Sequence, residues 1–440
     1  MHELPIKFVE RIHRQFPGEA DTFLAAFENQ VSASVLLNPY KYRPNDTVGK
    51  PLPWHPLGLE LPARPRFAAD PLWHAGVYYS QESSSMFLGH VLLQSGISPG
   101  GLFLDLCAAP GGKSLVISAV MCDDGLLVSN EMHPLRAAIL KENIVKHGRA
   151  NIAVTRNTPD ELAHLGPIFE MVLVDAPCSG EGMFRRDPAA RAEWNPGLPA
   201  MCAARQKDIL QSAHLLLRPG GLMVYSTCTF APDENEDILD FLENEWGYEA
   251  VAIDTPSGWP LQKVGRAFRF TPHISPGEGL FMAAIRKPGS EVPAQRKKAS
   301  GTLARVKPPE MPFAPRGLSE PIFFSRPKQT EIFACSANHF DIINALDRTA
   351  RVIGFPLEIG EIKGRDLVPA HHLAMASPPD FNPVNLDESA ALDFLRKNEI
   401  TLDAPKGWVL VGFKNRPLGW VKNLGNRSNN YYPKDYRLRT

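Results

Sequence analysis

Cysteine is scarce in this sequence. The 440 residues contain six cysteines, at positions 107, 122, 178, 202, 228 and 335. They are too few and too scattered for a disulfide scaffold, and none forms a CxxC pair or a Cys/His pair with zinc-finger spacing. We therefore expect no metal site, and any thiol that matters to function acts as a free thiol.

Long apolar runs and an excess of charge of one sign are also missing. No run approaches the roughly 18 apolar residues of a membrane-spanning helix. The first residues carry charge where a signal peptide has an apolar stretch, so we expect a cytoplasmic protein without a membrane segment. Lys plus Arg total 47 against 48 Asp plus Glu, a formal net charge of −1, which excludes a uniformly basic nucleic-acid coat protein. An anionic partner must therefore be bound by local patches.

The length favours several compact units, because single hydrophobic cores stop growing at roughly 250–300 residues. A stretch containing Arg296-Lys297-Lys298 and several prolines has few large apolar side chains and is typical of an exposed linker. We expect an N-terminal helical domain over 1–71, a central domain over 72–288, a linker over 289–325 and a C-terminal region over 326–440.

The central domain alternates short apolar runs with longer helix-like stretches, which is typical of βαβ units and a parallel sheet. The expected strands are 102–106, 126–129, 151–154, 171–174 and 222–225, and the expected helices start near 113 and span 134–147 and 206–217. The fold class that this pattern predicts is α/β, with a doubly wound, Rossmann-like central domain.

The regions on either side of the central domain lack its alternating strand and helix pattern. Two short amphipathic helices are expected near Ile6 to Arg14 and Asp21 to Glu28, followed by a Pro-rich extended stretch. At the other end, 407–413 and 418–421 resemble short strands with glycine turns, which suggests a small β-barrel behind a mixed α+β segment.

The turn after the first central strand reads Asp105-Leu-Cys-Ala-Ala-Pro-Gly-Gly-Lys-Ser114. Doubly wound sheets bind ligands at this place, and small residues let a ligand approach the backbone. The turn is neither GxGxxG nor a Walker A loop, since position 107 is Cys, which disfavours a dinucleotide or a triphosphate. Asp105, Glu131 and Asp175 all stand at strand ends, and a carboxylate can hold ribose hydroxyls. The pattern fits a cationic nucleoside such as S-adenosylmethionine.

Two cysteines follow neighbouring strands, in Asp175-Ala-Pro-Cys178-Ser-Gly-Glu-Gly-Met-Phe and in Tyr225-Ser-Thr-Cys228-Thr-Phe. The carboxyl ends of adjacent parallel strands meet at one edge, so both thiols should face one crevice. Turns at such an edge can expose and stabilise thiolates. The other cysteines outside the ligand turn are expected to be small buried hydrophobes; these are Cys122, Cys202 and Cys335.

The motifs DLCAAPGGKS at 105–114, DAPCSGEGMF at 175–184 and YSTCTF at 225–230, supported by YYSQE at 78–82 and NYYPK at 430–434, resemble the Sun-type (Nop/Sun) family of RNA cytosine-C5 methyltransferases. Within it, the chain is similar to bacterial small-subunit rRNA enzymes of the RsmF type. The resemblance covers nearly the whole chain and implies a PUA-like barrel at its end. It implies that S-adenosylmethionine is bound by Cys107, Ala108, Ala109, Pro110, Gly111, Gly112, Lys113, Glu131, Asn157 and Asp175.

The chemistry of that family explains two thiols. C5 of cytosine is a poor nucleophile, but a thiolate that adds at C6 turns C5 into an enamine-like carbon. The resemblance implies that Cys228 attacks C6, that Cys178 assists release of the product, and that Asp175 stabilises the charge at N3. DNA cytosine methyltransferases instead use a Pro-Cys thiol, which here would be Cys178. Lys113 either orients the nucleotide or the acids, or is an ordinary residue at a helix N-terminus.

RNA has to be bound by local patches of basic residues. The target base must be unpaired or flipped out of its helix. Candidates near the crevice are Arg185, Arg186, Arg191 and Arg205. Candidates in the tail are the basic residues Lys414, Arg416, Lys422, Arg427, Lys434, Arg437 and Arg439, interleaved with the aromatic residues Trp420, Tyr431, Tyr432 and Tyr436. We expect deletion of 326–440 to weaken RNA binding and to leave cofactor affinity intact.

The sequence thus predicts a monomeric methyltransferase that acts on small-subunit rRNA or on the ribosomal subunit. Three alternatives stay open: the same chemistry on tRNA, a DNA substrate, and a non-catalytic RNA-binding factor in ribosome assembly.

Overall fold

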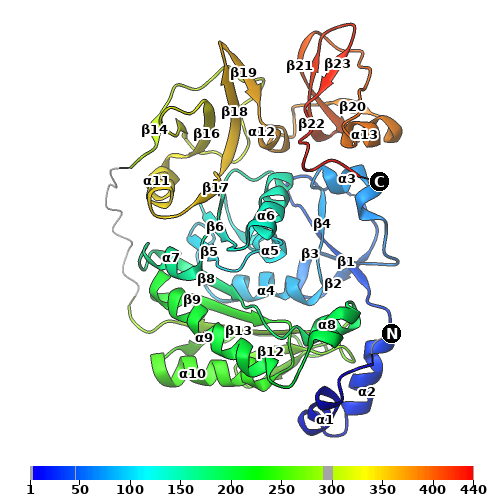
Figure 1. Ribbon diagram of the computed structural model, residues 1–440, viewed down its shortest axis with the longest axis vertical. Coiled ribbons are helices and arrows are strands. Elements are labelled where there is room, and N and C mark those ends of the chain that lie inside the picture. Colours follow the sequence, from blue (N-terminus) through cyan, green and yellow to red (C-terminus); the bar gives the residue numbers. More distant parts are fainter. Residues whose placement is uncertain (1–2, 45, 291–300, 440) are drawn as a thin grey trace.

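The centre of the protein is a ten-stranded sheet (Figure 1). The computed structural model describes residues 3–44, 46–290 and 301–439. The strand order is β11-β12-β13-β9-β8-β5-β6-β7-β17, with β10 paired to β13. Five strands run parallel: β5 (Leu102–Asp105), β6 (Leu126–Asn130), β7 (Ile152–Thr155), β8 (Phe169–Asp175) and β9 (Leu217–Thr227). Antiparallel strands extend the β9 side: β10 (Glu249–Ala250), β11 (Gln262–Val264), β12 (Ala267–Phe270) and β13 (Leu280–Arg286).

Helices cover both faces of this sheet, because side chains of successive strand residues point to opposite sides. Leu104 and Val128 pack with α9 and α10, whereas Phe103 and Leu127 pack with α4, α5 and α6. The bounds are α4 (Phe87–Gln94), α5 (Gly112–Val120), α6 (Pro134–His147), α7 (Pro159–Ala163), α9 (Leu198–Leu216) and α10 (Glu236–Trp246). The predicted Rossmann-like α/β domain is confirmed. Helix α9 begins eight residues earlier than predicted, with Pro199 in its first turn.

The N-terminal segment contains both predicted helices, α1 (Ile6–Gln15) and α2 (Ala20–Ala25), followed by the 3-10 turn η1 (Ala26–Glu28). The Pro-rich stretch after them is a sheet, with order β2-β3-β1-β4. Its strands are β1 (Ala33–Leu37), β2 (Lys50–Leu52), β3 (His55–Leu61) and β4 (Tyr78–Ser80), and α3 (Pro71–His74) precedes the last. Strand β4 lies beyond residue 71, so the N-terminal sheet takes its edge from the segment that leads into the central domain.

The expected linker has two parts. Its basic cluster at 296–298 lies outside the described residues, whereas residues 301–325 carry β14 (Ala304–Arg305) and β15 (Pro321–Ser325). These strands belong to a sheet with order β14-β15-β16-β18-β19. Its other elements are β16 (Glu331–Ser336), α11 (Phe340–Thr349), β18 (Leu357–Lys363), β19 (Asp366–Pro369) and α12 (His371–Met375).

Strand β17 (Val352–Gly354) leaves this C-terminal sheet and pairs antiparallel with β7 of the central sheet. Residues of α11 also share a core cluster with α9 and α10. The C-terminal region is therefore joined to the central domain by a strand and by a common hydrophobic core.

The last segment contains the strands predicted from its glycine-flanked apolar runs. It forms a four-stranded sheet with order β20-β21-β22-β23; its elements are β20 (Val384–Leu386), α13 (Glu388–Leu395), β21 (Gly407–Phe413), β22 (Arg416–Asn423) and β23 (Ser428–Asn430). Phe394 and Val411 pack in one cluster with Val35 and Tyr78 of the N-terminal sheet, and the C-terminus lies beside α3 (Figure 1).

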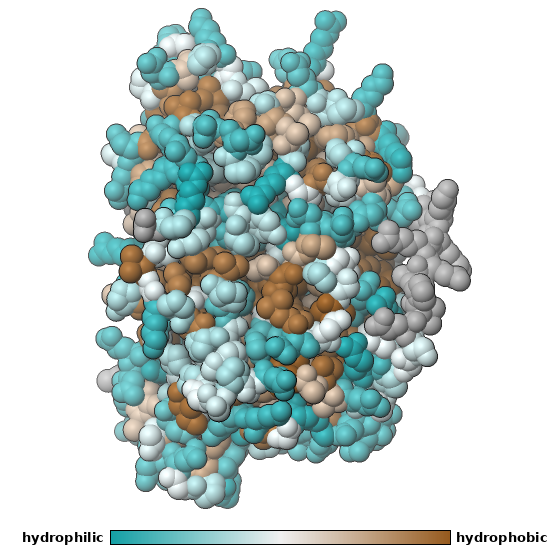
Figure 2. Space-filling view, turned by 180° about the vertical axis from the view of Figure 1, so that it is seen from behind, coloured by the Kyte–Doolittle hydropathy of each residue, from teal (hydrophilic) through white to brown (hydrophobic). Residues whose placement is uncertain are grey.

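The remaining short elements are the 3-10 turns η2 (Phe67–Ala69), η3 (Ser84–Met86), η4 (Glu181–Arg185), η5 (Pro232–Glu234) and η6 (Ala337–His339), and helix α8 (Pro188–Glu193). Within the described residues, no helix has the length and the apolar character needed to cross a bilayer. Seen from the face opposite to Figure 1, apolar side chains are interspersed with polar ones (Figure 2).

Candidate active site

The sequence-predicted acids and thiols meet at one edge of the central sheet. Asp105 ends β5, Glu131 directly follows β6, and Asp175 ends β8. The two cysteine loops follow β8 and β9, which are adjacent parallel strands. This is the edge where ligands bind in doubly wound sheets, at the point where the strand order reverses.

The turn between β5 and α5 is held in shape by α6. Arg136 donates to the carbonyl of Ala109 at 2.9 Å, and Asn143 donates to the carbonyl of Pro110 at 2.9 Å. Gly111 has φ +116°, in the left-handed region that favours glycine, immediately before the first residue of α5. The turn therefore presents small residues and a free helix N-terminus in a fixed conformation.

Gly112 marks a close approach between two domains. A Cβ atom at this position would lie 2.1 Å from Oε1 of Gln81, the residue that follows β4. Gln81 is buried, and its Oε1 has no hydrogen-bond partner among the described residues. The N-terminal sheet thus supplies a wall of the site, with an unused acceptor. The sequence pointed to the motif at 78–82 but gave its glutamine no role.

Two of the three strand-end carboxylates, Asp105 and Glu131, are sheltered from water. Asp105 is fully buried; its Oδ2 accepts from Ser114 at 2.7 Å, and its Oδ1 has no partner among the described residues. Burial raises the pKa of Asp105 to about 7, against the opposing effect of the Ser114 hydrogen bond. Glu131 is also buried and accepts from the backbone N–H of His133 at 2.8 Å. An orphaned buried acceptor beside a side-chain-free cradle fits a ligand rich in donors and positive charge, as S-adenosylmethionine is.

Lys113 and Asp175 form an ion pair, with Nζ 2.9 Å from Oδ1. Ser226 donates to the same oxygen at 2.8 Å. Burial lowers the pKa of Lys113, but the charge of Asp175 and its hydrogen bond outweigh this and raise the pKa above its ordinary value. Of the two interpretations of Lys113, the ion pair favours the one in which it orients an acid.

The sulfur atoms of Cys178 and Cys228 lie 3.3 Å apart, as the shared crevice predicts, and both thiols are partly exposed. The contact with Cys228 and then burial raise the pKa of Cys178 well above its ordinary value. Cys178 is therefore a protonated thiol that can donate to its neighbour. Burial likewise raises the pKa of Cys107 in the ligand turn.

The three cysteines predicted to be buried differ. Cys202 and Cys335 are buried, which confirms the expectation, but Cys122 is exposed, so the prediction for it was wrong. Cys122 lies in the loop between α5 and β6, where the chain runs over the surface and no apolar layer covers it.

Glu181 links the two cysteine loops. It is fully buried; Oε2 accepts from the backbone N–H of Phe230 at 3.1 Å and from Arg11 at 2.5 Å, and Oε1 accepts from Trp194 at 3.0 Å. Next to it, Gly182 donates its N–H to the carbonyl of Cys228 at 2.8 Å. Sequence reasoning gave Glu181 no role, although it stands within the quoted DAPCSGEGMF motif.

Glu234 fixes the other side of the Cys178 loop. Its Oε2 accepts from the backbone N–H of Ser179 and from Gln206, both at 2.9 Å, and its Oε1 accepts from the Ser179 hydroxyl. Burial raises the pKa of Glu234 to about 7. No pattern in the sequence pointed to this residue, because an acid after Pro-Asp is ordinary for a surface turn.

The N-terminal helices pack directly onto these loops. Phe8 and Phe23 belong to the same buried cluster as Phe184, Trp194 and Phe230, which follow the two cysteines in the chain. Phe8 contacts Phe184 edge-on at 5.0 Å between ring centroids, and Phe23 contacts Phe230 in the same way at 5.0 Å. The aromatic cluster therefore anchors both loops from behind.

Two of the four arginines predicted near the crevice hydrogen-bond to backbone carbonyls and so stabilise the fold. Arg185 donates to the carbonyls of Asn29, Gln30 and Gly277, and Arg191 is buried and donates to Phe184. Arg186, with a 52% exposed side chain, forms an ion pair with Glu278 at 3.5 Å. Arg205 is exposed on α9. Arg186 and Arg205 are therefore the members of this set that face solvent.

The basic and aromatic residues of the C-terminal tail likewise fall into a buried group and an exposed group. Trp420 and Tyr432 are buried, and Arg416 is buried in an ion pair with Asp46 at 2.6 Å, so the expectation that these residues contact RNA was wrong. Arg416 and Tyr432 pack the end of the chain against the N-terminal domain, whereas Trp420 packs within the C-terminal region and donates to the carbonyl of Ala370. Tyr431 is 39% exposed and contacts Trp408. The basic residues that stay on the surface are Lys414, Arg427, Lys434, Arg437 and Arg439.

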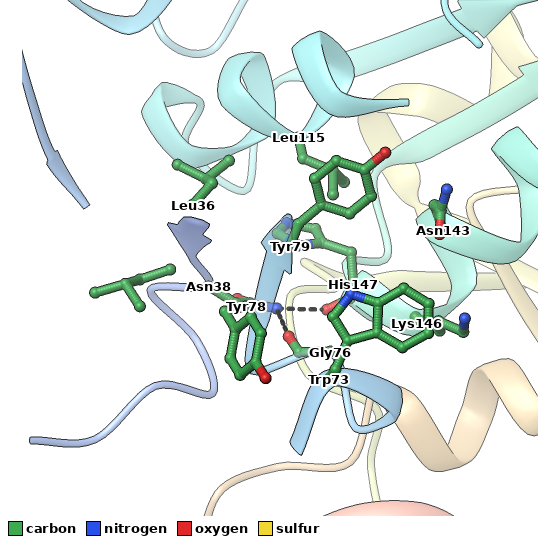
Figure 3. A pocket seen from close by; sticks show the side chains of 11 residues that line it. Leu36, Asn38, Trp73, Gly76, Tyr78, Tyr79, Leu115, Asn143, Lys146 and His147 are labelled. Carbon is green, nitrogen blue, oxygen red and sulfur yellow. Dashed lines mark hydrogen bonds between the residues drawn. The ribbon is translucent and has the colours of Figure 1, made fainter. Parts of the chain in front are cut away.

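A small cavity of about 20 Å³ lies between the N-terminal sheet and α5 and α6 (Figure 3). Asn38 donates across it to the carbonyls of Gly76 and His147, at 2.8 and 2.9 Å. The cavity has room for about one water molecule, and none of the predicted site residues lines it. It is a packing gap at the domain junction, and neither Cys178 nor Cys228 lines it.

Asn157 follows β7 and is 7% exposed. Its Oδ1 accepts from the backbone N–H of Arg351 at 2.9 Å, and its Nδ2 donates to Glu161 at 3.0 Å. The structure thus places this residue beside the same sheet edge as Glu131, with its amide oriented by the C-terminal region.

Three family models match successive parts of the chain. The model described as 16S rRNA methyltransferase RsmB/F matches residues 96–286. The N-terminal domain of 16S rRNA methyltransferase RsmF matches 4–83, and the methyltransferase RsmF PUA domain matches 381–438.

Relatives match over almost the full length. The ribosomal RNA small subunit methyltransferase F of Escherichia coli K12 is 30% identical over 98% of this chain and 96% of its own. The enzyme of the same name from Shewanella loihica is 28% identical over 99% of this chain and 96% of its own. Among solved structures, a methyltransferase homologue from Pyrococcus horikoshii superposes with a TM-score of 0.54, at 25% identity over 64% of this chain and 94% of that one. NSun6 from the same organism has a TM-score of 0.57 at 20% identity, over 65% and 99%.

The fold and the strand-end site define a Rossmann-like methyltransferase whose cofactor is S-adenosylmethionine. The chain belongs to the RsmB/F family of 16S rRNA methyltransferases, and its N-terminal and PUA domains are those of the RsmF type.

Proposed function

We propose that this protein methylates C5 of a cytosine in small-subunit rRNA through a transient bond between Cys228 and C6 of the base. The observation that carries the proposal is the pair of free thiols 3.3 Å apart at the sheet edge that also holds the Lys113–Asp175 ion pair. Attack on C6 needs only one thiol. The second thiol in contact with it supports a separate role for Cys178 in releasing the methylated base from Cys228.

The bound cofactor supplies an electrophilic sulfonium methyl group. The turn at 107–113 and Glu131 would hold the amino-acid and ribose parts of the cofactor. Asn157 would face its adenine. Gly111 and Gly112 leave room for close approach to the backbone. The orphaned acceptors on Asp105 and Gln81 are suited to donors on the cofactor or on the base.

In the proposed reaction Asp175, which is paired with Lys113, takes the proton of the Cys228 thiol and passes it to N3 of cytosine. The sulfur of Cys228 forms a bond to C6 at the same time, and C5 becomes nucleophilic and accepts the methyl group. C5 then carries a methyl group and a proton that must leave. N3 returns its proton to Asp175, and Asp175 releases this proton to solvent.

The second thiol completes the cycle. Cys178, whose pKa is raised by its contact with Cys228 and by burial, donates its proton to the sulfur of Cys228 as the bond to C6 breaks. The proton lost from C5 then restores the Cys178 thiol. The bond between Cys228 and C6 is thereby broken again while the new methyl group stays on C5, and one proton is released for each methyl group transferred.

The test is a denaturing gel of protein mixed with substrate RNA and S-adenosylmethionine. We expect Cys228→Ser to abolish methyl transfer without forming an adduct, and Cys178→Ser to trap a covalent protein–RNA adduct. Cys122→Ser, an exposed cysteine outside the site, is the matched control and should behave like the parent. An adduct with Cys228→Ser but none with Cys178→Ser would assign the nucleophile to Cys178.

The proposed substrate is small-subunit rRNA or the assembled subunit, bound by the N-terminal domain and the C-terminal region, and the proposed state is a cytoplasmic monomer. Bisulfite sequencing of total RNA from cells with and without the gene would identify the modified cytosine. A loss of 5-methylcytosine in tRNA alone would replace the substrate class. Binding of the cofactor without any lost mark would point to a non-catalytic role in assembly.

A further inference from the structure

The adenine side of the proposed cofactor pocket is connected to the C-terminal region by a continuous set of hydrogen bonds. The backbone N–H of Arg351 donates to Asn157 Oδ1 at 2.9 Å, and the N–H of Arg156 donates to the carbonyl of Arg351 at 2.9 Å. Directly after Arg351, β17 pairs with β7. The segment that touches Asn157 is therefore held against the sheet edge at Arg351 and directly after it.

The same network continues inward through Asn130, the last residue of β6. Its Oδ1 accepts from the N–H of Asn157 at 3.1 Å, and its Nδ2 donates to the carbonyls of Asn157 and Leu106 at 3.0 and 3.1 Å. Its own carbonyl accepts from the N–H of Ala108 at 2.8 Å. Asn130 is 1% exposed, so water does not compete for these bonds. A displacement of Asn157 would reach the cofactor turn through one residue, Asn130.

The contacts with Arg351 and Glu161 together set which end of the Asn157 amide carries the oxygen. Because Oδ1 accepts a backbone N–H, the NH₂ group lies on the other side, where one hydrogen bonds Glu161. Its second hydrogen is left for the pocket. Without the N–H of Arg351, the bond to Glu161 alone holds the amide in this orientation.

We propose that Arg351, through its backbone N–H, is a positioning residue for the cofactor: the C-terminal region sets the amide of Asn157 and the cofactor turn, and so raises the affinity for S-adenosylmethionine. This inference rests on the proposed assignment of Asn157 to the adenine end. It replaces the expectation that 326–440 can be deleted without loss of cofactor affinity, because that deletion removes both Arg351 and β17.

The experiment uses the full chain and two substitutions at one position. Arg351→Pro removes the N–H that Asn157 accepts, and the preceding Ala350 is already extended (φ −122°, ψ 158°), as a residue before proline must be. Arg351→Ala keeps the N–H and loses only an exposed side chain. We expect titration calorimetry to show S-adenosylmethionine binding about tenfold weaker for Arg351→Pro and within about twofold of the parent for Arg351→Ala.

Kinetics separate positioning from a general loss of structure. We expect Arg351→Pro to raise the KM for S-adenosylmethionine while the KM for RNA and kcat at saturating cofactor stay within about twofold. A merely structural role would lower kcat through a smaller folded fraction. Equal cofactor affinity of the proline and alanine variants would overturn the proposal.

A double-mutant cycle with Asn157→Ala tests whether the two residues act through one bond. If the two residues act through one bond, Arg351→Pro adds nothing to Asn157→Ala, whereas independent effects add. Additive losses would overturn the proposal. Failure of the proposed function is recognised separately: a parent protein that binds S-adenosylmethionine but does not methylate cytosine would refute the function and leave this coupling intact.

Discussion

Arg11, in the first helix of the chain, forms an ion pair with Glu181, a fully buried carboxylate between the two cysteine loops. The first helix is thereby tied to the catalytic edge by charge as well as by its aromatic side chains. Removal of one partner leaves a buried charge without compensation, which costs more than the pair itself contributes.

We predict that Arg11→Met lowers the free energy of unfolding by about 3 kcal/mol, because Glu181 then stays buried without its cation. Methyl transfer should fall as well, since Glu181 positions the N–H of Phe230 two residues after Cys228. Urea denaturation and single-turnover kinetics measure the two effects. Arg14→Met, at an exposed position of the same helix, is the control, and an equal response of both variants would contradict the role of the ion pair.

The pH dependence of stability should reveal Glu234. Burial raises its pKa from 4.5 to about 7, so between these pH values the folded state holds a proton that the unfolded chain has lost. Its contribution to stability is therefore full below pH 4.5 and is lost as the pH rises to about 7, by roughly 3 kcal/mol at most. Asp105, with a pKa of about 7, acts in the same direction.

Glu234→Gln should flatten this fall in the free energy of unfolding between pH 5 and 8, whatever its effect on absolute stability. Asp233→Asn, an exposed neighbour, should leave the slope as in the parent. Chemical denaturation at a series of pH values tests both variants, and identical slopes for Glu234→Gln and the parent would refute the raised pKa.

Gly112→Ala should weaken cofactor binding, because the added Cβ would lie 2.1 Å from Gln81 Oε1 and force that amide out of place. The double variant Gln81→Ala, Gly112→Ala removes the overlap and should recover folding stability without recovering full affinity. Gly197→Ala, where the nearest atom to a new Cβ is at 3.4 Å, serves as a control. The measurements are thermal unfolding and titration calorimetry. A Gly112→Ala variant with the parent's affinity would show that the close approach is unimportant.

Two basic residues of the last segment should respond in opposite ways. Arg416→Ala breaks a buried ion pair with Asp46 and should lower the free energy of unfolding by about 3 kcal/mol. Lys434→Ala, at an exposed position, should leave stability unchanged but weaken RNA binding and reduce its salt dependence. Denaturation curves and filter binding at several salt concentrations distinguish them; a loss of stability with Lys434→Ala would contradict the division into buried and surface charges.

Much of the central domain could be predicted because its strands are continuous apolar runs between helices, and parallel sheets bury both faces. The same regularity placed Cys178 and Cys228 at one edge, since the ends of adjacent parallel strands meet there. The motif at 105–114 likewise predicted the turn between β5 and α5, and its role in ligand binding stays a prediction.

Other features depend on partners that are remote in the chain. The N-terminal sheet was missed because β2 and β3 each contain a proline and because β2 and β4 have only three residues each. Trp420, Tyr432 and Arg416 look like an RNA-binding surface in sequence, yet tertiary packing buries them. Three-residue β17 carries no local signal, and only the long-range pairing with β7 reveals it.

That pairing has a consequence for synthesis of the protein. Until residues 352–354 have been made, the hydrogen-bonding groups along β7 have no neighbour on their outer side, and a bare sheet edge invites mispairing with other chains. The nascent enzyme must carry this open edge while the whole intervening sequence is translated. A chaperone, or a delay in folding of the Rossmann unit, would be of most use in that interval.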